Sequence, residues 1–164
     1  MLYKKAKFFW KTHNCSKEIF CMPYDENMEY YAFLKQYYNE GYRQIIITSE
    51  IMIEIIKHFV LEKGISVYNI EFMEDDSDLV EEIESLIDRF LEDKVFFVRL
   101  LEKLNFLAEK SSIDIKRVFF KGRNNEGIAI NFYMQSNGII GIDEKNFSSL
   151  SAEISNLIAG CLFK

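Results

Sequence analysis

Residues 74–93, EDDSDLVEEIESLIDRFLED, contain the strongest periodic pattern in the chain. Seven apolar residues in it fall at i, i+1, i+4, i+7, i+8, i+11 and i+12, namely Leu79, Val80, Ile83, Leu86, Ile87, Phe90 and Leu91. This spacing puts them all on one face of an α-helix. Ten of the 20 residues are acidic and only Arg89 is basic. The pattern predicts a helix with one face buried and the other acidic, which requires a folded core for the helix to cover.

Strand patterns on both sides of this helix predict the fold class. Two apolar-aromatic segments, about 3–12 and 17–22, flank the polar turn THNCSK and indicate an N-terminal hairpin. A strand at 43–48, a helix after Ser49 and a strand at 65–72 fit a central β-α-β unit with a parallel crossover. The segments IDIKRVFFKG, GIAINFYMQ and IIGID indicate a C-terminal antiparallel meander, with Asn137-Gly138 as a hairpin turn.

Five helices complete the prediction. Besides the acidic helix, helices are expected from an Asp25 cap to about Asn39, from Ser49 to Gly64, from an Asp93 cap to about Lys110, and over about 149–162. We therefore expect an α+β (mixed α/β) fold with a mixed sheet of about six or seven strands. At 164 residues, the chain has the size of a single domain, 1–164.

Composition indicates a globular protein of the cytoplasm. Hydrophobic residues make up 49% of the chain and there is one proline, which is unlike a disordered protein. Lysines interrupt the N-terminal apolar runs, and no segment approaches 18 apolar residues, so neither a signal peptide nor a membrane span is expected. Three cysteines without a C-x-x-C pair predict reduced thiols.

The net charge of −6 is unevenly distributed along the chain. Residues 71–93 carry 11 acidic side chains and one basic side chain, whereas the rest of the chain is slightly basic. The acids expected on the outer face of the helix are Glu81, Glu82, Glu84, Asp88 and Glu92. Such a one-signed face is either solvated surface or a docking surface that steers a basic protein partner.

Tyrosines mark a second candidate partner-binding surface. Six of the nine lie within residues 24–42, and Tyr30, Tyr31, Tyr37 and Tyr38 fall on the helix expected there. They cover a wider arc than one apolar stripe, so some should reach solvent, where tyrosine favours interfaces. The alternative is that they are half-buried with hydrated hydroxyls.

A metal site is the main alternative to partner docking. Glu71, Asp76 and Asp78 follow a strand, and Glu50 follows the preceding strand of the expected β-α-β unit. Carboxylates at strand ends are typical of divalent-metal sites that act on phosphoesters. The other explanation is a helix start whose dipole favours acids. Apart from this conditional site, no metal or other cofactor is expected.

Other motifs give little support for catalysis or nucleic-acid binding. His58 has Glu54 one turn before it, a pairing that is more often a local contact than a catalytic dyad. No nucleophile or phosphate-loop motif occurs. Basic residues surround Phe119 and Phe120, and Lys5, Lys7 and Lys11 share a strand face, but the pI of 5.1 and the need to fill a core make nucleic acid an unfavoured partner.

The sequence therefore favours a non-enzymatic protein-binding protein. Small size, acidity and a one-signed helix fit an immunity-type or antitoxin-type inhibitor that docks a basic partner through its acidic helix. Two alternatives stay open: a metal-dependent nuclease or phosphoesterase that uses Glu50, Glu71, Asp76 and Asp78, and a structural or phage accessory subunit. The sequence predicts no particular oligomeric state.

Overall fold

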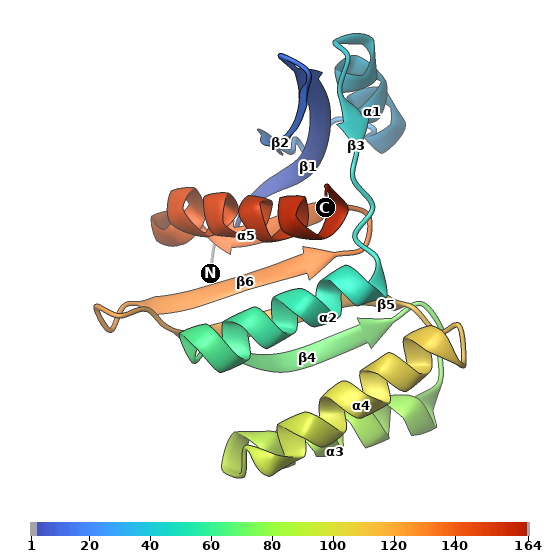
Figure 1. The fold of residues 1–164 in the computed structure, drawn as a ribbon, viewed down its shortest axis with the longest axis vertical. Helices are drawn as coiled ribbons and strands as arrows, with labels where there is room; N and C mark the ends of the chain where they lie inside the picture. Colours follow the sequence, from blue (N-terminus) through green and yellow to red (C-terminus); the bar gives the residue numbers. More distant parts are fainter. Residues whose placement is uncertain (1–2, 164) are drawn as a thin grey trace. The chain divides into compact units, whose positions relative to one another are not determined.

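The computed structural model describes residues 3–163, and within this range the chain forms five α-helices and seven β-strands (Figure 1). The fold class is α+β, as predicted. Contacts between Cα atoms divide the chain into two compact units. The terminal unit comprises Met1–Ile47 and Asn137–Lys164, and the central unit comprises Thr48–Ser136. A single domain over residues 1–164 stays a prediction.

The terminal unit is built around one long strand, β1 (Tyr3–His13). This strand pairs antiparallel with β2 (Ser16–Pro23), with the two-residue β3 (Arg43–Gln44) and with β7 (Ile139–Asp143). Asn14 and Cys15 form the turn between β1 and β2, with φ angles of 48° and 64°. Positive φ at both central residues is what a tight hairpin turn requires, because it matches the twist of the strands. The predicted N-terminal hairpin is confirmed.

Two helices complete the terminal unit, α1 (Tyr30–Asn39) and α5 (Phe147–Leu162). Four consecutive residues of β1, Ala6 to Phe9, are buried, so both faces of this strand are covered. The ring of Phe9 packs at 6.0 Å from that of Phe33 and at 5.0 Å from that of Tyr37, which joins β1 to α1. Helix α5 contacts β2 and β7.

Helix α1 starts later than the sequence predicted. The carboxylate of Glu29 accepts hydrogen bonds from the backbone amides of Tyr31 and Ala32, which caps the helix. Asp25 instead accepts a bond from the amide of Asn27 in the preceding turn. Both carboxylates accept hydrogen bonds from backbone amides. A carboxylate therefore caps the helix as expected, but the capping residue is Glu29 and not Asp25.

The central unit contains an antiparallel sheet with β5 in the middle. Its strands are β4 (Ser66–Phe72), β5 (Ile115–Arg123) and β6 (Ala129–Gln135). Helix α2 (Ser49–Lys57), which runs on into a π-helical turn (His58–Glu62), lies in front of the strands in Figure 1. The ring of Phe59 packs 5.6 Å from that of Phe120 and 5.0 Å from that of Phe132.

Helices α3 (Ser77–Glu92) and α4 (Val95–Glu109) lie side by side in the same unit (Figure 1). The acidic helix is therefore where the sequence predicted it. Asp76 caps α3 by accepting a hydrogen bond of 3.1 Å from the amide of Leu79. The inner face of α3 packs against α4 and β4, with the Phe90 and Phe97 rings 5.2 Å apart. Asp93 accepts a bond from the Val95 amide, which fits its predicted role at the start of α4.

The predicted parallel crossover is wrong. Within each unit, the pairings among the described strands are all antiparallel: β3 pairs with β1, and β4 pairs with β5. Of residues 43–48 only two form a strand, although Ile45 and Ile47 are buried. An apolar segment predicts that its residues are buried, but it does not predict which strand the segment will pair with. Within residues 3–163 no helix has the length and apolarity that crossing a bilayer demands.

Candidate partner-binding surface on α3 and α4

The outer face of α3 carries the acids that the sequence placed there. All five predicted residues are exposed: Glu81, Glu82, Glu84, Asp88 and Glu92. Within residues 3–163, Glu82 alone among them forms an ion pair, at 3.2 Å from the Nζ of Lys103 on α4. Four carboxylates are thus left without a cation in the part of the chain that the structure describes. Glu82 is correctly placed at the surface, but its charge is already partly neutralised.

Arg89, the single basic residue of α3, does not neutralise the outer face. Its guanidinium lies 5.5 Å from the centroid of the Phe96 ring, and Arg99 approaches the same ring at 5.1 Å. Carboxylates one turn apart, such as Glu84 and Asp88, therefore repel each other without relief from an ion pair among the described residues. The negative field of this face is directed towards solvent.

Helix α4 adds apolar side chains that the sequence reasoning missed. Val95, Val98 and Phe106 are 64%, 56% and 52% exposed. They lie on the side of α4 opposite its buried residues, which are Phe97, Leu100, Leu104 and Leu107. Val98 and Phe106 lie outside the apolar stripe expected for this helix. Their positions in the sequence could therefore have indicated that they are exposed. The exposed Arg99 and Glu102 share this side of α4, so it presents apolar and charged groups together, as contact surfaces commonly do.

Acidic and apolar side chains thus occur on one packed helix pair. We refer to Glu81, Glu84, Asp88 and Glu92 of α3, together with Val95, Val98 and Phe106 of α4, as the α3–α4 outer surface. The acids supply long-range attraction for a cation, and the apolar groups supply contact area at short range.

The tyrosine helix divides its side chains between core and solvent. Tyr31 and Tyr38 are 74% and 59% exposed, and their spacing of seven residues places them on one side of α1. Tyr30 and Tyr37 are half-buried, and burial raises the pKa of both hydroxyls. Two of the four tyrosines are thus exposed and two half-buried, and their role in partner binding stays a prediction.

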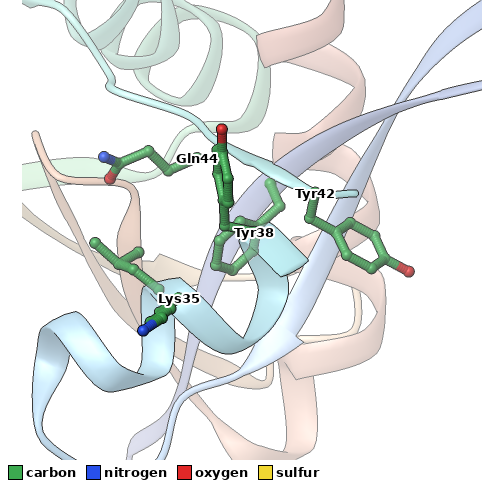
Figure 2. Close-up of a pocket in the computed structure, with 6 residues that line it drawn as sticks. Lys35, Tyr38, Tyr42 and Gln44 are labelled. Carbon is green, nitrogen blue, oxygen red and sulfur yellow. The ribbon is translucent and has the colours of Figure 1, made fainter. Parts of the chain in front are cut away.

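A hollow of about 280 Å³ lies in the terminal unit beside Tyr38 (Figure 2). Its lining comes from α1, β1 and the segment around β3, and consists of Phe9, Leu34, Lys35, Tyr38, Tyr42 and Gln44. The guanidinium of Arg43 lies 4.0 Å from the centroid of the Tyr38 ring and donates a 3.0 Å hydrogen bond to the carbonyl of Tyr42. Tyr38 is thus exposed yet held in place.

The lysines of β1 do not form an exposed basic face. Lys7 is fully buried, and its ammonium donates to the carbonyl oxygen of Asn137. Burial lowers the pKa of Lys7 from its usual 10.5 to about 8. Lys5 forms an ion pair with Glu26, and the Nζ of Lys11 lies 4.6 Å from the centroid of the Tyr42 ring. These cations are occupied within the fold.

Two of the four carboxylates of the alternative metal site have other roles. Asp76 caps α3, and the Oε2 of Glu71 lies 3.7 Å from the Nε of Arg117. Residues 3–163 contain no group of three or more His, Cys, Asp or Glu side chains placed to hold a metal ion. Glu50 and Asp78 are therefore not brought together with Glu71 and Asp76 into such a site, and the geometry gives the metal-dependent enzyme no support.

Other reactive groups are also in structural contacts. His58 Nδ1 lies 3.1 Å from an oxygen of Glu62, whereas Glu54, the expected partner, pairs with Lys57 at 3.0 Å. Cys15, Cys21 and Cys161 are thiols rather than disulfides, as predicted.

Comparison with protein-family models, with curated proteins and with solved structures gives no significant match to this chain. The functional interpretation therefore depends on the geometry of its surfaces.

Proposed function

We propose that this chain is a non-enzymatic protein-binding protein of the cytoplasm, which docks a basic protein through the α3–α4 outer surface. The observation that carries the proposal is the set of four exposed carboxylates without an ion pair among the described residues, on a helix that packs against another with three exposed apolar side chains. Charge complementarity would speed the encounter, and burial of Val98 and Phe106 would slow dissociation.

An immunity-type or antitoxin-type inhibitor is the class that this arrangement supports best. Toxins that act on nucleic acid need a basic surface for phosphate. An acidic helix can cover such a surface, and the like-charge repulsion within α3 would be relieved when a cationic partner docks. The hydrophobic neighbours would then provide the affinity that charge alone rarely supplies.

The test compares capture of a basic partner by the wild-type chain and by three variants. Glu81→Lys combined with Glu84→Lys should lower the association rate about tenfold or more at low salt, with a smaller effect at high salt. Phe106→Ala should instead raise the dissociation rate, with little salt dependence. Glu18→Lys combined with Glu126→Lys carries the same charge change at exposed positions outside α3 and serves as the control.

Two results would contradict the proposal. One is a partner that the doubly reversed chain binds with unchanged rates. The other is an equal loss of association for the control pair, which would mean that net charge rather than the α3–α4 outer surface controls the encounter.

A further inference from the structure

Two adjacent phenylalanines of strand β5, Phe119 and Phe120, lie on opposite faces of the central sheet. Phe120 is fully buried on the α2 side, where its ring stacks on that of Phe132 at 4.5 Å. Phe119 is half-buried on the other face, because successive side chains of a strand alternate. The sequence-based expectation that both rings fill the core is right for Phe120 and wrong for Phe119.

Aromatic rings from three neighbouring strands meet on the Phe119 face. The ring of Phe119 lies 5.7 Å from that of Tyr68 on β4 and 5.8 Å from that of Tyr133 on β6. Tyr133 is 6% exposed, whereas Tyr68 and Phe119 are partly open to solvent. Tyr68 and Phe119 therefore present part of their side chains to solvent, and the buried Tyr133 packs against Phe119.

Cations surround these rings. The guanidinium of Arg117 lies 5.6 Å from the Phe119 ring centroid and 5.5 Å from that of Tyr133, and the Nζ of Lys121 lies 5.1 Å from that of Tyr68. Arg123 follows at the end of β5, where its Nη1 donates a 2.7 Å bond to the carbonyl of Gly127. Alternation along the described strands β4, β5 and β6 places three cations and one carboxylate, Glu71, on this face.

A hollow of about 360 Å³ adjoins the cationic end of the rings. Its lining comes from β4, β5, β6 and the end of α3, and consists of Ser66, Leu91, Lys121, Gly122, Arg123, Ala129 and Asn131. These side chains offer ammonium, guanidinium, amide and hydroxyl groups, which are the donors that phosphate oxygens accept from.

We propose that this face, the β4–β6 platform (Tyr68, Arg117, Phe119, Lys121 and Arg123), binds single-stranded nucleic acid. Unpaired bases would stack on Tyr68 and Phe119, and the phosphates between them would contact Lys121 and Arg123. Single strands fit because their bases present free ring faces, which a duplex keeps stacked. The hollow of the platform reaches Leu91 of α3, and the occupant of the platform has the opposite charge from that of the α3–α4 outer surface.

The acidity of the chain does not prevent this binding. Residues 71–93 hold the excess negative charge, and the outward carboxylates of α3 are largely screened beyond about 8 Å at physiological salt. The attraction at the platform depends on cations that contact the strand directly, over distances shorter than this screening length.

The test is fluorescence anisotropy of the full chain with labelled oligouridine and oligothymidine of about 12 nucleotides, at several salt concentrations. Lys121→Gln combined with Arg123→Gln should weaken binding at least tenfold at about 50 mM salt and reduce the slope of log K against log salt by about 1.4. Phe119→Leu should weaken binding about tenfold at every salt concentration and leave the slope unchanged, because it removes stacking and keeps the charge. Lys35→Gln combined with Lys145→Gln, two exposed lysines elsewhere, should stay within about twofold of wild type.

Three results would overturn the proposal. The first is no saturable binding at about 10⁻⁴ M wild-type protein, the weak end of non-specific association. The second is equal weakening by the control pair. The third is equally tight binding of a duplex or of polyglutamate, which would show a surface for any polyanion. Far-ultraviolet circular dichroism and a thermal melt of each variant ensure that lost binding is not lost folding.

Discussion

Five cations of the terminal unit and the outer carboxylates of α3 in the central unit are held in opposite ways. In the terminal unit, cations lie against rings: Lys4 over Phe147, Lys11 over Tyr42, Lys17 over Trp10 and Arg43 over Tyr38, while Lys7 is buried. In the central unit, α3 leaves four carboxylates in solvent. Long cationic side chains can bury their stems and contact an aromatic face, whereas a carboxylate needs donors or water. These five cations therefore contribute to the packing of the terminal unit, whereas four carboxylates of α3 form no ion pair among the described residues.

The largest expected effect separates the inner and outer faces of α3. Ile87 is 2% exposed, so Ile87→Ala should lower the free energy of unfolding by about 2–5 kcal/mol through lost burial and a cavity. Glu84→Ala, three residues away on the outer face, should change it by less than about 0.5 kcal/mol. Urea unfolding of both variants measures this difference. Similar values for the two would mean that the outer face of α3 also belongs to the core.

Helix α3 could be predicted from the sequence because several signals agree there. Period and charge segregation both indicate one helix in one orientation, and four of the seven stripe residues are buried as expected. Val80 and Leu91 were also expected on the buried face, but both are exposed. Exposure of the five acids was predicted correctly, and their role in docking stays a prediction.

The other errors come from properties that only tertiary contacts determine. Nothing in RQIIIT reveals that two residues alone would pair, or that the partner would be β1. Nothing in KKAKFF distinguishes Lys7, which is buried, from Lys5, which pairs with Glu26. The opposite faces of Phe119 and Phe120 were implied by alternation, but which face α2 would cover was not.

The second prediction concerns the buried cation of the terminal unit. The folded pKa of Lys7 is about 8 and its unfolded value is 10.5, so between these values the unfolded chain binds more protons and stability rises with pH. Lys7 alone would raise the free energy of unfolding by about 1 kcal/mol from pH 8 to 9. Burial raises the pKa of Cys21 from 9.0 to about 12, which has the opposite sign, so it slows the rise from about pH 9 and ends it below about pH 10. Above pH 10, the raised pKa values of Tyr30 and Tyr37 make stability fall.

Urea unfolding at closely spaced pH values tests this profile. Lys7→Met keeps the length of the side chain and should remove the rise between pH 8 and 9. Cys21→Ser should let the rise continue past pH 9 without slowing there, because the opposing thiol is gone. If Lys7→Met keeps the wild-type profile, the ammonium is hydrated in the folded protein and the contrast between the units is weaker than proposed.

The third prediction concerns the cation stacked on Tyr38. Arg43→Ala should lower the free energy of unfolding by about 1 kcal/mol, because it removes the ring contact and the bond to the Tyr42 carbonyl. Arg43→Lys keeps the charge but loses the planar guanidinium, so its free energy of unfolding should lie between those of the wild type and Arg43→Ala. Chemical unfolding measures both variants. A loss from Arg43→Ala that high salt abolishes would point to net charge rather than to this local packing.

The smallest expected effect is the change in stability when charge repulsion on the acidic face of α3 is relieved. Glu84 lies one turn from both Glu81 and Asp88 on α3, so Glu84→Lys replaces two repulsions with two attractions. Each such pair contributes a few tenths of a kcal/mol, which predicts a gain of about 0.5 kcal/mol, or about 1–2 °C in Tm, at low salt. Glu84→Gln removes the repulsion without adding attraction and should give about half of this gain. At about 1 M salt, where the screening length is about 3 Å, both gains should disappear. A variant that is less stable than wild type at both salt concentrations would mean that Glu84 makes a favourable contact in the fold, and α3 would then hold its charge as the terminal unit does.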